Sequence, residues 1–277
     1  MQPGLSVSDT GSGPTVLLLH GQPGSRYDWR QVSALLADDH RVLVPDRPGY
    51  GRSNGPAVGM SDNADLLATM LISRSTGAVI VVGHSYAGGI AVLLAVSHPE
   101  LVRGLVLAAP LGHRSSVTAI DRLLAKPIVG DLLSAVGLYA LGRVLPSLRR
   151  TISNGHKEDD AQKRSLDRLK RWLAASLPDD QESREMLKPW RRILRSFVTE
   201  QRAMVREIGS VEAALGQIAV PTVVVAGDMD VVVASRAAAA TASGIRGSEL
   251  IKLPSVGHFL PRDAPEVLAQ AVRRVAL

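Results

Sequence analysis

A serine, two aspartates and a histidine each follow a short run of aliphatic residues in this chain of 277 residues. They are Ser85, Asp228, Asp230 and His258, in that order along the sequence. Serine is a weak nucleophile until a base removes its proton, and a histidine base needs an acid that fixes its tautomer and stabilises its charge. These residue types in this order predict nucleophilic catalysis by Ser85, with His258 as the base and one of the two aspartates as the acid.

Six aliphatic runs alternate with segments of helical length, and they predict the sheet that would bring these residues together. Each run is continuous rather than alternating, which indicates strands buried on both faces, as in a parallel sheet covered by helices. We therefore predict an α/β fold with a mostly parallel, doubly wound sheet and a short edge strand near Leu5. Ligands bind at the carboxyl ends of the strands in such sheets, where the candidate residues would converge. The runs span residues 15–20, 41–46, 79–84, 104–110, 222–228 and 249–254.

The alternation of strands and helices stops between residues 112 and 215. Apolar residues there follow helical spacing, and several prolines divide the segment into separate helices. We expect residues 1–111 and 216–277 to form the α/β core, and residues 112–215 to form an inserted helical cap.

The positive charge of the chain lies in this predicted cap. Residues 112–212 contain 19 Lys and Arg against 13 Asp and Glu, a net charge of +6, which equals the formal charge of the whole chain. A solvated helical surface would explain this excess. A basic lid that attracts anionic substrates, an acyl carrier or an anionic membrane surface would explain it too.

Composition and motifs exclude several other kinds of protein. The chain has no cysteine, so it forms no disulfide and has no thiolate metal site. Aromatic residues make up only 3% of the chain, which argues against a nucleic-acid platform that stacks bases. The sequence also lacks metal-ligand spacing, a dinucleotide fingerprint and a P-loop, so we expect no cofactor. Without a signal peptide or a run long enough to cross a membrane, we expect a soluble, cytoplasmic protein that binds a small molecule, with no stable membrane insertion.

The serine stands in the segment GHSYAG, residues 83–88, between an apolar run and a helical segment. A G-x-S-x-G pattern at such a strand-to-helix turn exposes the serine at the end of a sheet. The fifth position here is Ala87 instead of glycine, and the glycine is displaced to Gly88. This departure bears on the local geometry of the turn, because glycine allows a strand and a helix to pack closely.

Five segments together resemble the α/β-hydrolase superfamily, in particular its cap-bearing serine hydrolases of the esterase type. The resemblance covers nearly the whole chain, and the segments occur in the family's order with compatible spacing. It implies that Ser85 is the nucleophile and His258 the base, and it favours Asp230 over Asp228 as the acid. The segments are HGQPG (20–24), DRPGYGRS (46–53), GHSYAG (83–88), GDMD (227–230) and GHF (257–259).

The same resemblance implies an oxyanion hole. Its donors would be the backbone N–H groups of Gln22 and Tyr86, since backbone donors are fixed in place before the reaction begins. We expect His20 and His84 to have structural roles. Asp46 is expected to anchor its own loop through Arg47 or Arg52.

These residues favour a cofactor-independent serine hydrolase that cleaves a carboxylic ester or a related acyl compound through an acyl-enzyme. Trp172 and Trp190 of the cap would help to form an apolar pocket. Serine at position 85 argues against a haloalkane dehalogenase or an epoxide hydrolase, whose relatives carry aspartate there. A C–C bond hydrolase, a lactonase, an amidase or an acyltransferase could use the same triad, and a non-catalytic ligand receptor is a less favoured alternative.

Overall fold

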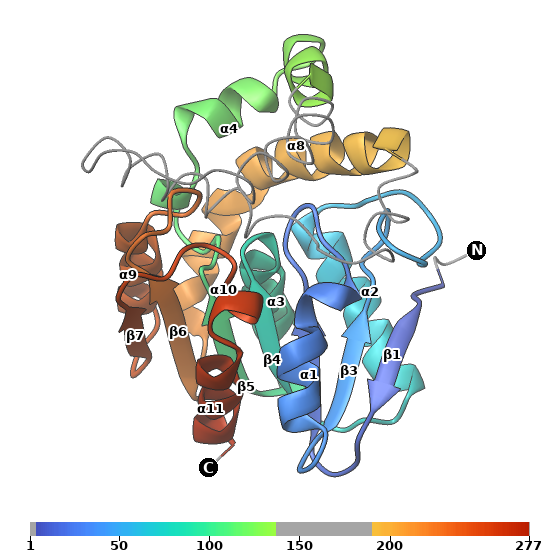
Figure 1. Ribbon diagram of the computed structural model, residues 1–277, viewed down its shortest axis with the longest axis vertical. Coiled ribbons are helices and arrows are strands. Elements are labelled where there is room, and N and C mark those ends of the chain that lie inside the picture. Colours follow the sequence, from blue (N-terminus) through green and yellow to red (C-terminus); the bar gives the residue numbers. More distant parts are fainter. Residues whose placement is uncertain (1–3, 137–189, 277) are drawn as a thin grey trace, which may run out of the picture.

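The computed structural model describes residues 4–136 and 190–276, in which seven strands form one sheet (Figure 1). The strand order is β1-β3-β2-β4-β5-β6-β7. Only β1 is antiparallel to its neighbour β3, and every other pair is parallel. The predicted mostly parallel α/β sheet is therefore confirmed. The strands are β1 (Val7–Thr10), β2 (Thr15–Leu19), β3 (Arg41–Pro45), β4 (Val79–His84), β5 (Val102–Ala108), β6 (Thr222–Gly227) and β7 (Glu249–Leu253).

The burial of each strand explains its sequence pattern. Every residue of β2, β4 and β6 is buried, in agreement with their continuous aliphatic runs. Strand β7 lies at the edge of the sheet, and its Glu249 and Lys252 are exposed. Charged side chains on an edge strand also discourage pairing with a further chain.

Helices cover both faces of the sheet. Side chains alternate between the faces along a strand, so Val16 and Leu18 of β2 join one apolar cluster, whereas Leu17 and Leu19 join the other. The first cluster is completed by α1 (Arg30–Leu36), α10 (Leu260–Asp263) and α11 (Pro265–Val275). The second is completed by α2 (Met60–Ser73), α3 (Tyr86–Ser97), α8 (Trp190–Ala214) and α9 (Ser235–Gly244).

The predicted cap is described in part. Its described elements include η3 (Arg114–Ser116), α4 (Ala119–Leu124) and α8, which lie beyond one end of the strands (Figure 1). A further short helix, η4 (Leu215–Gln217), begins at the last residue of the predicted cap. Trp172 lies outside the described residues, as does the side chain of Trp190. The division at residues 112 and 215 into core and cap thus stays a prediction.

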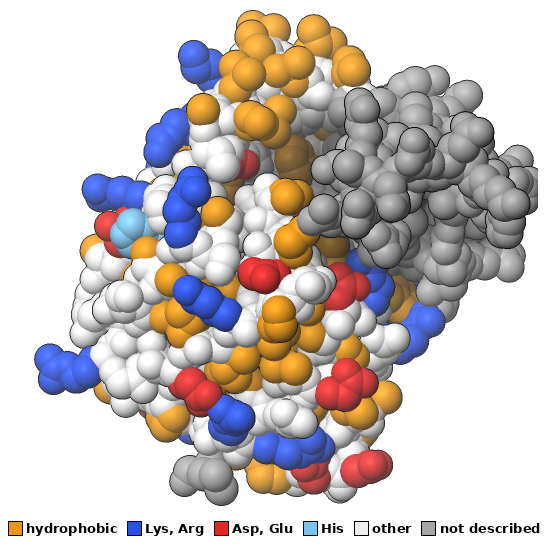
Figure 2. Space-filling model, turned by 60° about the vertical axis from the view of Figure 1, so that its left-hand side comes forward, with side chains coloured by type: hydrophobic (Ala, Val, Ile, Leu, Met, Phe, Trp, Pro, Cys, Tyr) orange, Lys and Arg blue, Asp and Glu red, His pale blue; other side chains and the backbone are white. Residues whose placement is uncertain are grey.

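Apolar side chains are exposed on α4 and on the residues that follow it. Ile120, Ile128 and Leu132 expose 68%, 80% and 65% of their surface. Figure 2 shows hydrophobic side chains gathered at the top of the molecule, with Lys and Arg side chains below them along one side. The described part of the predicted cap therefore exposes apolar side chains on α4 and on the residues that follow it.

The loop after β3 is anchored by the buried carboxylate of Asp46. This carboxylate accepts hydrogen bonds from the Nε and the terminal nitrogen of Arg26 at 2.9 and 2.6 Å. It also accepts the backbone N–H groups of Arg26 and Arg52, each at 2.9 Å. The expected anchoring role is present, and Arg52 takes part through its backbone N–H, but the ion pair is formed by Arg26 and not by Arg47 or Arg52. Arg26 forms the ion pair because the side chain of Arg47 turns into the core toward Glu200.

Gly51 permits this arrangement because it has a φ of +49° and lies against the Asp46 carboxylate. A Cβ atom at Gly51 would lie 2.2 Å from the Asp46 carboxylate, which no real contact allows. Gly77 has a similar φ of +64° but has no heavy atom within 4 Å of the equivalent position. An alanine at position 77 would therefore have only backbone strain, whereas an alanine at position 51 would have both backbone strain and a steric clash.

We predict that Gly51→Ala destabilises the protein more than Gly77→Ala does. The left-handed backbone costs an alanine about 1 kcal/mol at either site, whereas only Gly51→Ala also displaces the Asp46 carboxylate. We expect the loss at Gly51 to be at least twice the loss at Gly77, measured as the free energy of unfolding in urea. Equal losses would show that the Asp46 loop tolerates the added methyl group.

Candidate active site

Ser85 occupies a tight turn between β4 and α3. Its φ is +54° and its ψ is −119°, a conformation that a residue other than glycine adopts only when its surroundings enforce it. The Ser85 N–H donates to Ala108 O at 2.9 Å, and its carbonyl accepts the N–H groups of Gly88 and Leu111 at 2.8 and 3.0 Å. These three hydrogen bonds fix the backbone of the turn.

The methyl group of Ala87 fits within the apolar core behind this turn. Ala87 is fully buried in the cluster that also contains Leu19. The close approaches occur at neighbouring positions instead: a Cβ at Gly83 would lie 2.4 Å from Ala87 O, and one at Gly88 would lie 2.5 Å from Pro110 Cβ. The turn therefore needs glycine at positions 83 and 88, and position 87 accepts alanine.

The structure brings together Ser85, His258 and Asp230. His258 Nε2 lies 3.0 Å from Ser85 Oγ, and His258 Nδ1 lies 2.8 Å from Asp230 Oδ2. The other carboxylate oxygen, Asp230 Oδ1, accepts the backbone N–H groups of Val232 and Val233, each at 2.8 Å. Because a carboxylate only accepts hydrogen bonds, Nδ1 of His258 carries a proton, and Nε2 is free to accept the serine proton.

The second candidate acid lies elsewhere. Asp228 Oδ1 accepts the N–H of Ser255 at 2.7 Å, and among the described contacts its carboxylate has none with His258. Asp230, which the family resemblance favoured over Asp228, is therefore the aspartate within hydrogen-bond distance of His258.

His84 supports His258 from the position next to Ser85 in the chain. Its Nε2 donates to the carbonyl oxygen of His258 at 2.9 Å, and the two rings lie 4.9 Å apart between centroids. Burial lowers the pKa of His84 to about 3, with a further contribution from His258. His84 is therefore neutral near pH 7 and holds the backbone of His258, which is the structural role we expected.

The predicted oxyanion loop lies against the serine turn. A Cβ at Gly21 would lie 3.1 Å from Ser85 Cβ and 3.0 Å from His84 Nδ1, so the chain passes close to Ser85. The Gln22 side chain donates to the carbonyl oxygen of Phe197 in α8 at 2.7 Å. Tyr86 is the first residue of α3, where backbone N–H groups have no partner within the helix.

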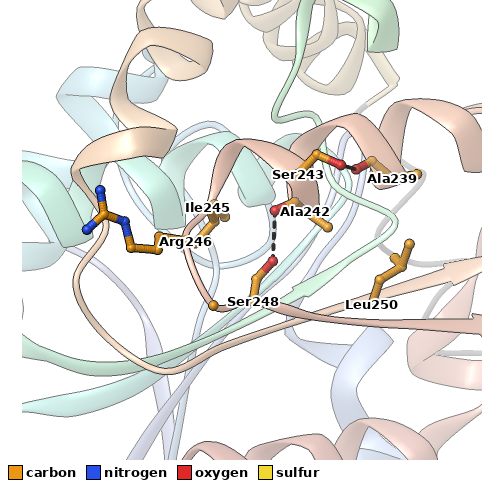
Figure 3. Close-up of a pocket in the computed structure, with 8 residues that line it drawn as sticks. Ala239, Ala242, Ser243, Ile245, Arg246, Ser248 and Leu250 are labelled. Atoms are coloured by element: carbon orange, nitrogen blue, oxygen red, sulfur yellow. Dashed lines mark hydrogen bonds between the residues drawn. The ribbon is translucent and has the colours of Figure 1, made fainter.

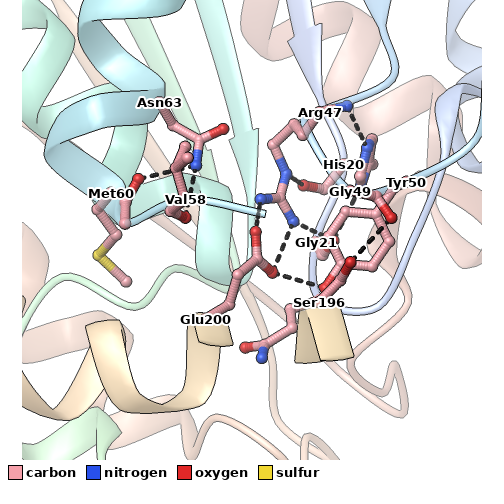
Figure 4. Close-up of polar contacts among 12 residues, drawn as sticks. His20, Gly21, Arg47, Gly49, Tyr50, Val58, Met60, Asn63, Ser196 and Glu200 are labelled. Atoms are coloured by element: carbon pink, nitrogen blue, oxygen red, sulfur yellow. Dashed lines mark hydrogen bonds and ion pairs between the residues drawn. The ribbon is translucent and has the colours of Figure 1, made fainter. Parts of the chain in front are cut away.

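A buried ion pair that we did not predict lies beside this loop (Figure 4). Arg47 binds Glu200 of α8, both side chains are fully buried, and Tyr50 Oη donates to Glu200 Oε2 at 2.8 Å. Burial opposes the charge on each partner, but the paired Glu200 carboxylate keeps the pKa of Arg47 raised. The sequence did contain a signal: Glu200 stands on the same helical face as Met204 and Val211, and a carboxylate on an apolar face needs a buried partner.

A depression of about 390 Å³ lies between α9 and β7, away from Ser85 (Figure 3). Its hydroxyl groups are already used, since Ser243 donates to Ala239 O at 3.0 Å and Ser248 donates to Ala242 O at 2.8 Å. The lining contains no carboxylate or histidine, so it offers no acid–base chemistry. It is lined by Ala239, Ala242, Ser243, Ile245, Arg246, Gly247, Ser248 and Leu250.

Within residues 4–136 and 190–276, no helix is long and apolar enough to cross a membrane. Within the same ranges, no group of three or more histidines and carboxylates is arranged to hold a metal ion.

A mostly parallel α/β sheet with a hydrogen-bonded serine, histidine and aspartate at one edge is the arrangement of an α/β hydrolase. A family model described as "Alpha/beta hydrolase family" matches residues 16–271, and the chain belongs to this family. It is 30% identical to an uncharacterized protein of Mycobacterium tuberculosis, over 95% of this chain and 75% of that protein. It is also 28% identical to a haloalkane dehalogenase of Mesorhizobium japonicum, over 94% of this chain and 84% of that enzyme.

Solved structures agree with this family. A thermophilic esterase from Thermogutta terrifontis is similar with a TM-score of 0.71 and 25% identity, over 98% of this chain and 92% of that one. The family and the hydrolases among its relatives support a hydrolase enzyme.

The buried neutral histidines predict a loss of stability in acid. The pKa values of His20 and His84 are lowered to about 3 from 6.5. Between pH 6.5 and about pH 3, these two histidines therefore take up protons in the unfolded chain but stay neutral in the native protein. The free energy of unfolding therefore falls by about 1.4 kcal/mol per pH unit for each histidine as the pH decreases.

We expect His84→Gln to reduce this slope by about 1.4 kcal/mol per pH unit. The glutamine amide can still donate to the carbonyl oxygen of His258, but it does not titrate. Urea unfolding between pH 7 and pH 4 measures the slope, and the value at pH 7 reports any loss of stability unrelated to protons. A slope equal to that of the wild type would contradict the burial of a neutral imidazole at this position.

Proposed function

We propose that the protein is a serine hydrolase that cleaves a carboxylic ester or a related acyl compound. The observation that carries this proposal is the continuous chain of hydrogen bonds from Ser85 Oγ through His258 to Asp230, with lengths of 3.0 and 2.8 Å. Ser85 would be the nucleophile, His258 the general base and Asp230 the acid that orients the base.

The reaction would take place in two steps. His258 Nε2 accepts the Ser85 proton while Oγ attacks the acyl carbon, and the oxyanion is stabilised by the N–H groups of Gln22 and Tyr86. The bond to the leaving oxygen then breaks, and His258 gives its proton to the departing alcohol. In the second step a water molecule loses a proton to His258 and attacks the acyl-enzyme, which releases the carboxylic acid and restores the Ser85 hydroxyl.

The backbone of the turn supports this role for Ser85. A left-handed conformation costs a serine free energy, and it persists because Ala108, Gly88 and Leu111 all bind this residue. The rigid turn gives Oγ its position before substrate binds. We further propose that residues 112–215 act as a cap over this edge of the sheet, with α8 as the described part that contacts the loop at Gln22.

Serine at position 85 separates this proposal from dehalogenation. Haloalkane dehalogenases and epoxide hydrolases of this family carry an aspartate at the nucleophile position, which forms an ester with an alkyl carbon. A serine hydroxyl activated by histidine instead attacks acyl carbons. We therefore expect esterase activity and no dehalogenase activity, although a dehalogenase is among the relatives.

Variants of the triad test the proposal. We expect Ser85→Ala and His258→Ala to lower kcat for a p-nitrophenyl ester by at least about 10³-fold, and Asp230→Asn by about 10²–10⁴-fold. Asp228→Asn is the matched control. Its amide oxygen can still accept the Ser255 N–H, so we expect activity within about twofold of the wild type.

Labelling with a fluorophosphonate tests whether Ser85 is the nucleophile, and the result does not depend on which substrate is chosen. The wild type should be labelled, and Ser85→Ala should not. Wild-type rates in both the Ser85 and His258 variants would refute the mechanism. A panel of esters, lactones, amides and β-diketones then assigns the bond that is cleaved, since all of these can use the same triad. Tight retention of a ligand with negligible turnover across the panel would favour a receptor.

A further inference from the structure

One buried guanidinium holds the loop after β2, next to the proposed oxyanion hole (Figure 4). Arg47 Nε donates to His20 O at 2.9 Å, and a terminal nitrogen of Arg47 donates to Gly21 O at 2.8 Å. Glu200 of α8 binds the same guanidinium from the other side, with one contact at 3.3 Å and a second that is shorter. The guanidinium of Arg47 thus joins the loop after β2 to helix α8.

His20 provides a second hydrogen-bond donor to the carbonyl oxygen of Gly21. Its Nε2 accepts the Arg47 backbone N–H at 2.9 Å, so the ring proton is on Nδ1, which donates to Gly21 O at 2.9 Å. Burial and the charge of Arg47 lower the pKa of His20 to about 3, so the ring is neutral at pH 7. The Gly21 carbonyl therefore accepts two hydrogen bonds, one of them from a cation.

The Gly21 carbonyl and the Gln22 N–H belong to the same peptide unit. In a planar trans peptide, the C=O and N–H bonds point in opposite directions. Donors fixed at the oxygen therefore orient the N–H toward the opposite side. They also draw electron density from the amide, which makes the N–H a stronger donor, since hydrogen bonds in a chain polarise one another.

We propose that Arg47, anchored by Glu200, is a positioning residue that orients and polarises the Gly21–Gln22 peptide, so that helix α8 determines the strength of the oxyanion hole. This inference rests on the proposed function of Ser85 and Gln22. A second contact from α8 agrees with it: the Gln22 side chain donates to Phe197 O at 2.7 Å, one helical turn from Glu200. Both contacts join the loop to the same helix.

The ion pair could instead serve only to attach α8 to the core. A buried ion pair is weak evidence for stability, because desolvation of the charges offsets their attraction. The two roles differ in what happens when both charges are removed together. A neutral pair of side chains could still attach α8 to the core, so a role in attachment alone would be preserved. Polarisation of the Gly21 carbonyl group, in contrast, requires the guanidinium of Arg47.

The double variant Arg47→Met/Glu200→Gln separates the two roles. Arg47→Met alone leaves a buried carboxylate without its cation, so we expect a clear decrease in Tm. The double variant has no buried charge at this site, and the glutamine oxygen can still accept the Tyr50 hydroxyl, so its Tm should return most of the way to the wild-type value. We expect its kcat for an ester to stay about 10–100-fold below that of the wild type, with KM within about threefold.

Binding of an alkylboronic acid, which forms a tetrahedral adduct with the serine, measures the oxyanion hole directly. We expect its affinity for the double variant to fall by about the same factor as kcat. Arg202→Met is the matched control, because it removes an ion pair of α8 with Asp131 that has no contact with the loop. It should leave kcat and boronate affinity within about twofold of the wild type.

All rates are expressed per site titrated by fluorophosphonate, so that unfolded protein does not count. A wild-type kcat and boronate affinity per titrated site in both Arg47 variants would overturn the positioning role, whatever their Tm. An unlabelled wild type, or a Ser85→Ala variant with full activity, would overturn the proposed function instead. The two failures are therefore distinguishable.

Discussion

The hydrogen bond between Ser85 Oγ and His258 Nε2 joins residues that are 173 positions apart in the chain. It forms because β4, β5, β6 and β7 are adjacent and parallel, so that their carboxyl ends meet at one edge. The register carries this alignment across the sheet, with His84 opposite Ala108, Ala108 opposite Val225, and Gly227 opposite Leu253. A slip of one residue in any of these pairs would turn its side chains to the other face and separate the three groups.

Two buried, neutral histidines lie beside Ser85 and the predicted oxyanion loop. His20 and His84 are buried without charge, so each can hold a backbone carbonyl without adding a cation beside His258. Arg47 is charged, but Glu200 accompanies it. A buried charge without a partner would cost several kcal/mol. Arg47 is thus a buried, paired cation beside the predicted oxyanion loop, where it donates to the carbonyl groups of His20 and Gly21.

Helix α8 belongs to the segment that we predict to be the cap, yet several of its polar contacts are with loops of the core. Ser196 donates to Gly49 O at 2.9 Å, and Glu207 accepts the Met60 N–H at 2.7 Å at the start of α2. Glu200 stands between them on the same face of the helix. A helix with this row of contacts places the loops after β2 and β3 relative to one another, and these loops lie beside Ser85.

The sequence by itself determined the central strands, the order of the candidate triad residues and the strand-to-helix turn that contains Ser85. Aliphatic runs and turn residues are local signals, so they can be recognised without the tertiary structure. The sequence also confined the candidate acid to Asp228 or Asp230, with the family resemblance favouring Asp230, and the tertiary structure places Asp230 within hydrogen-bond distance of His258. The same holds for Asp46, whose partner proved to be Arg26, and for Glu200, which lies 153 residues from Arg47. Contacts between charged side chains depend on which loops and helices meet in space, and no local pattern of residues specifies that meeting.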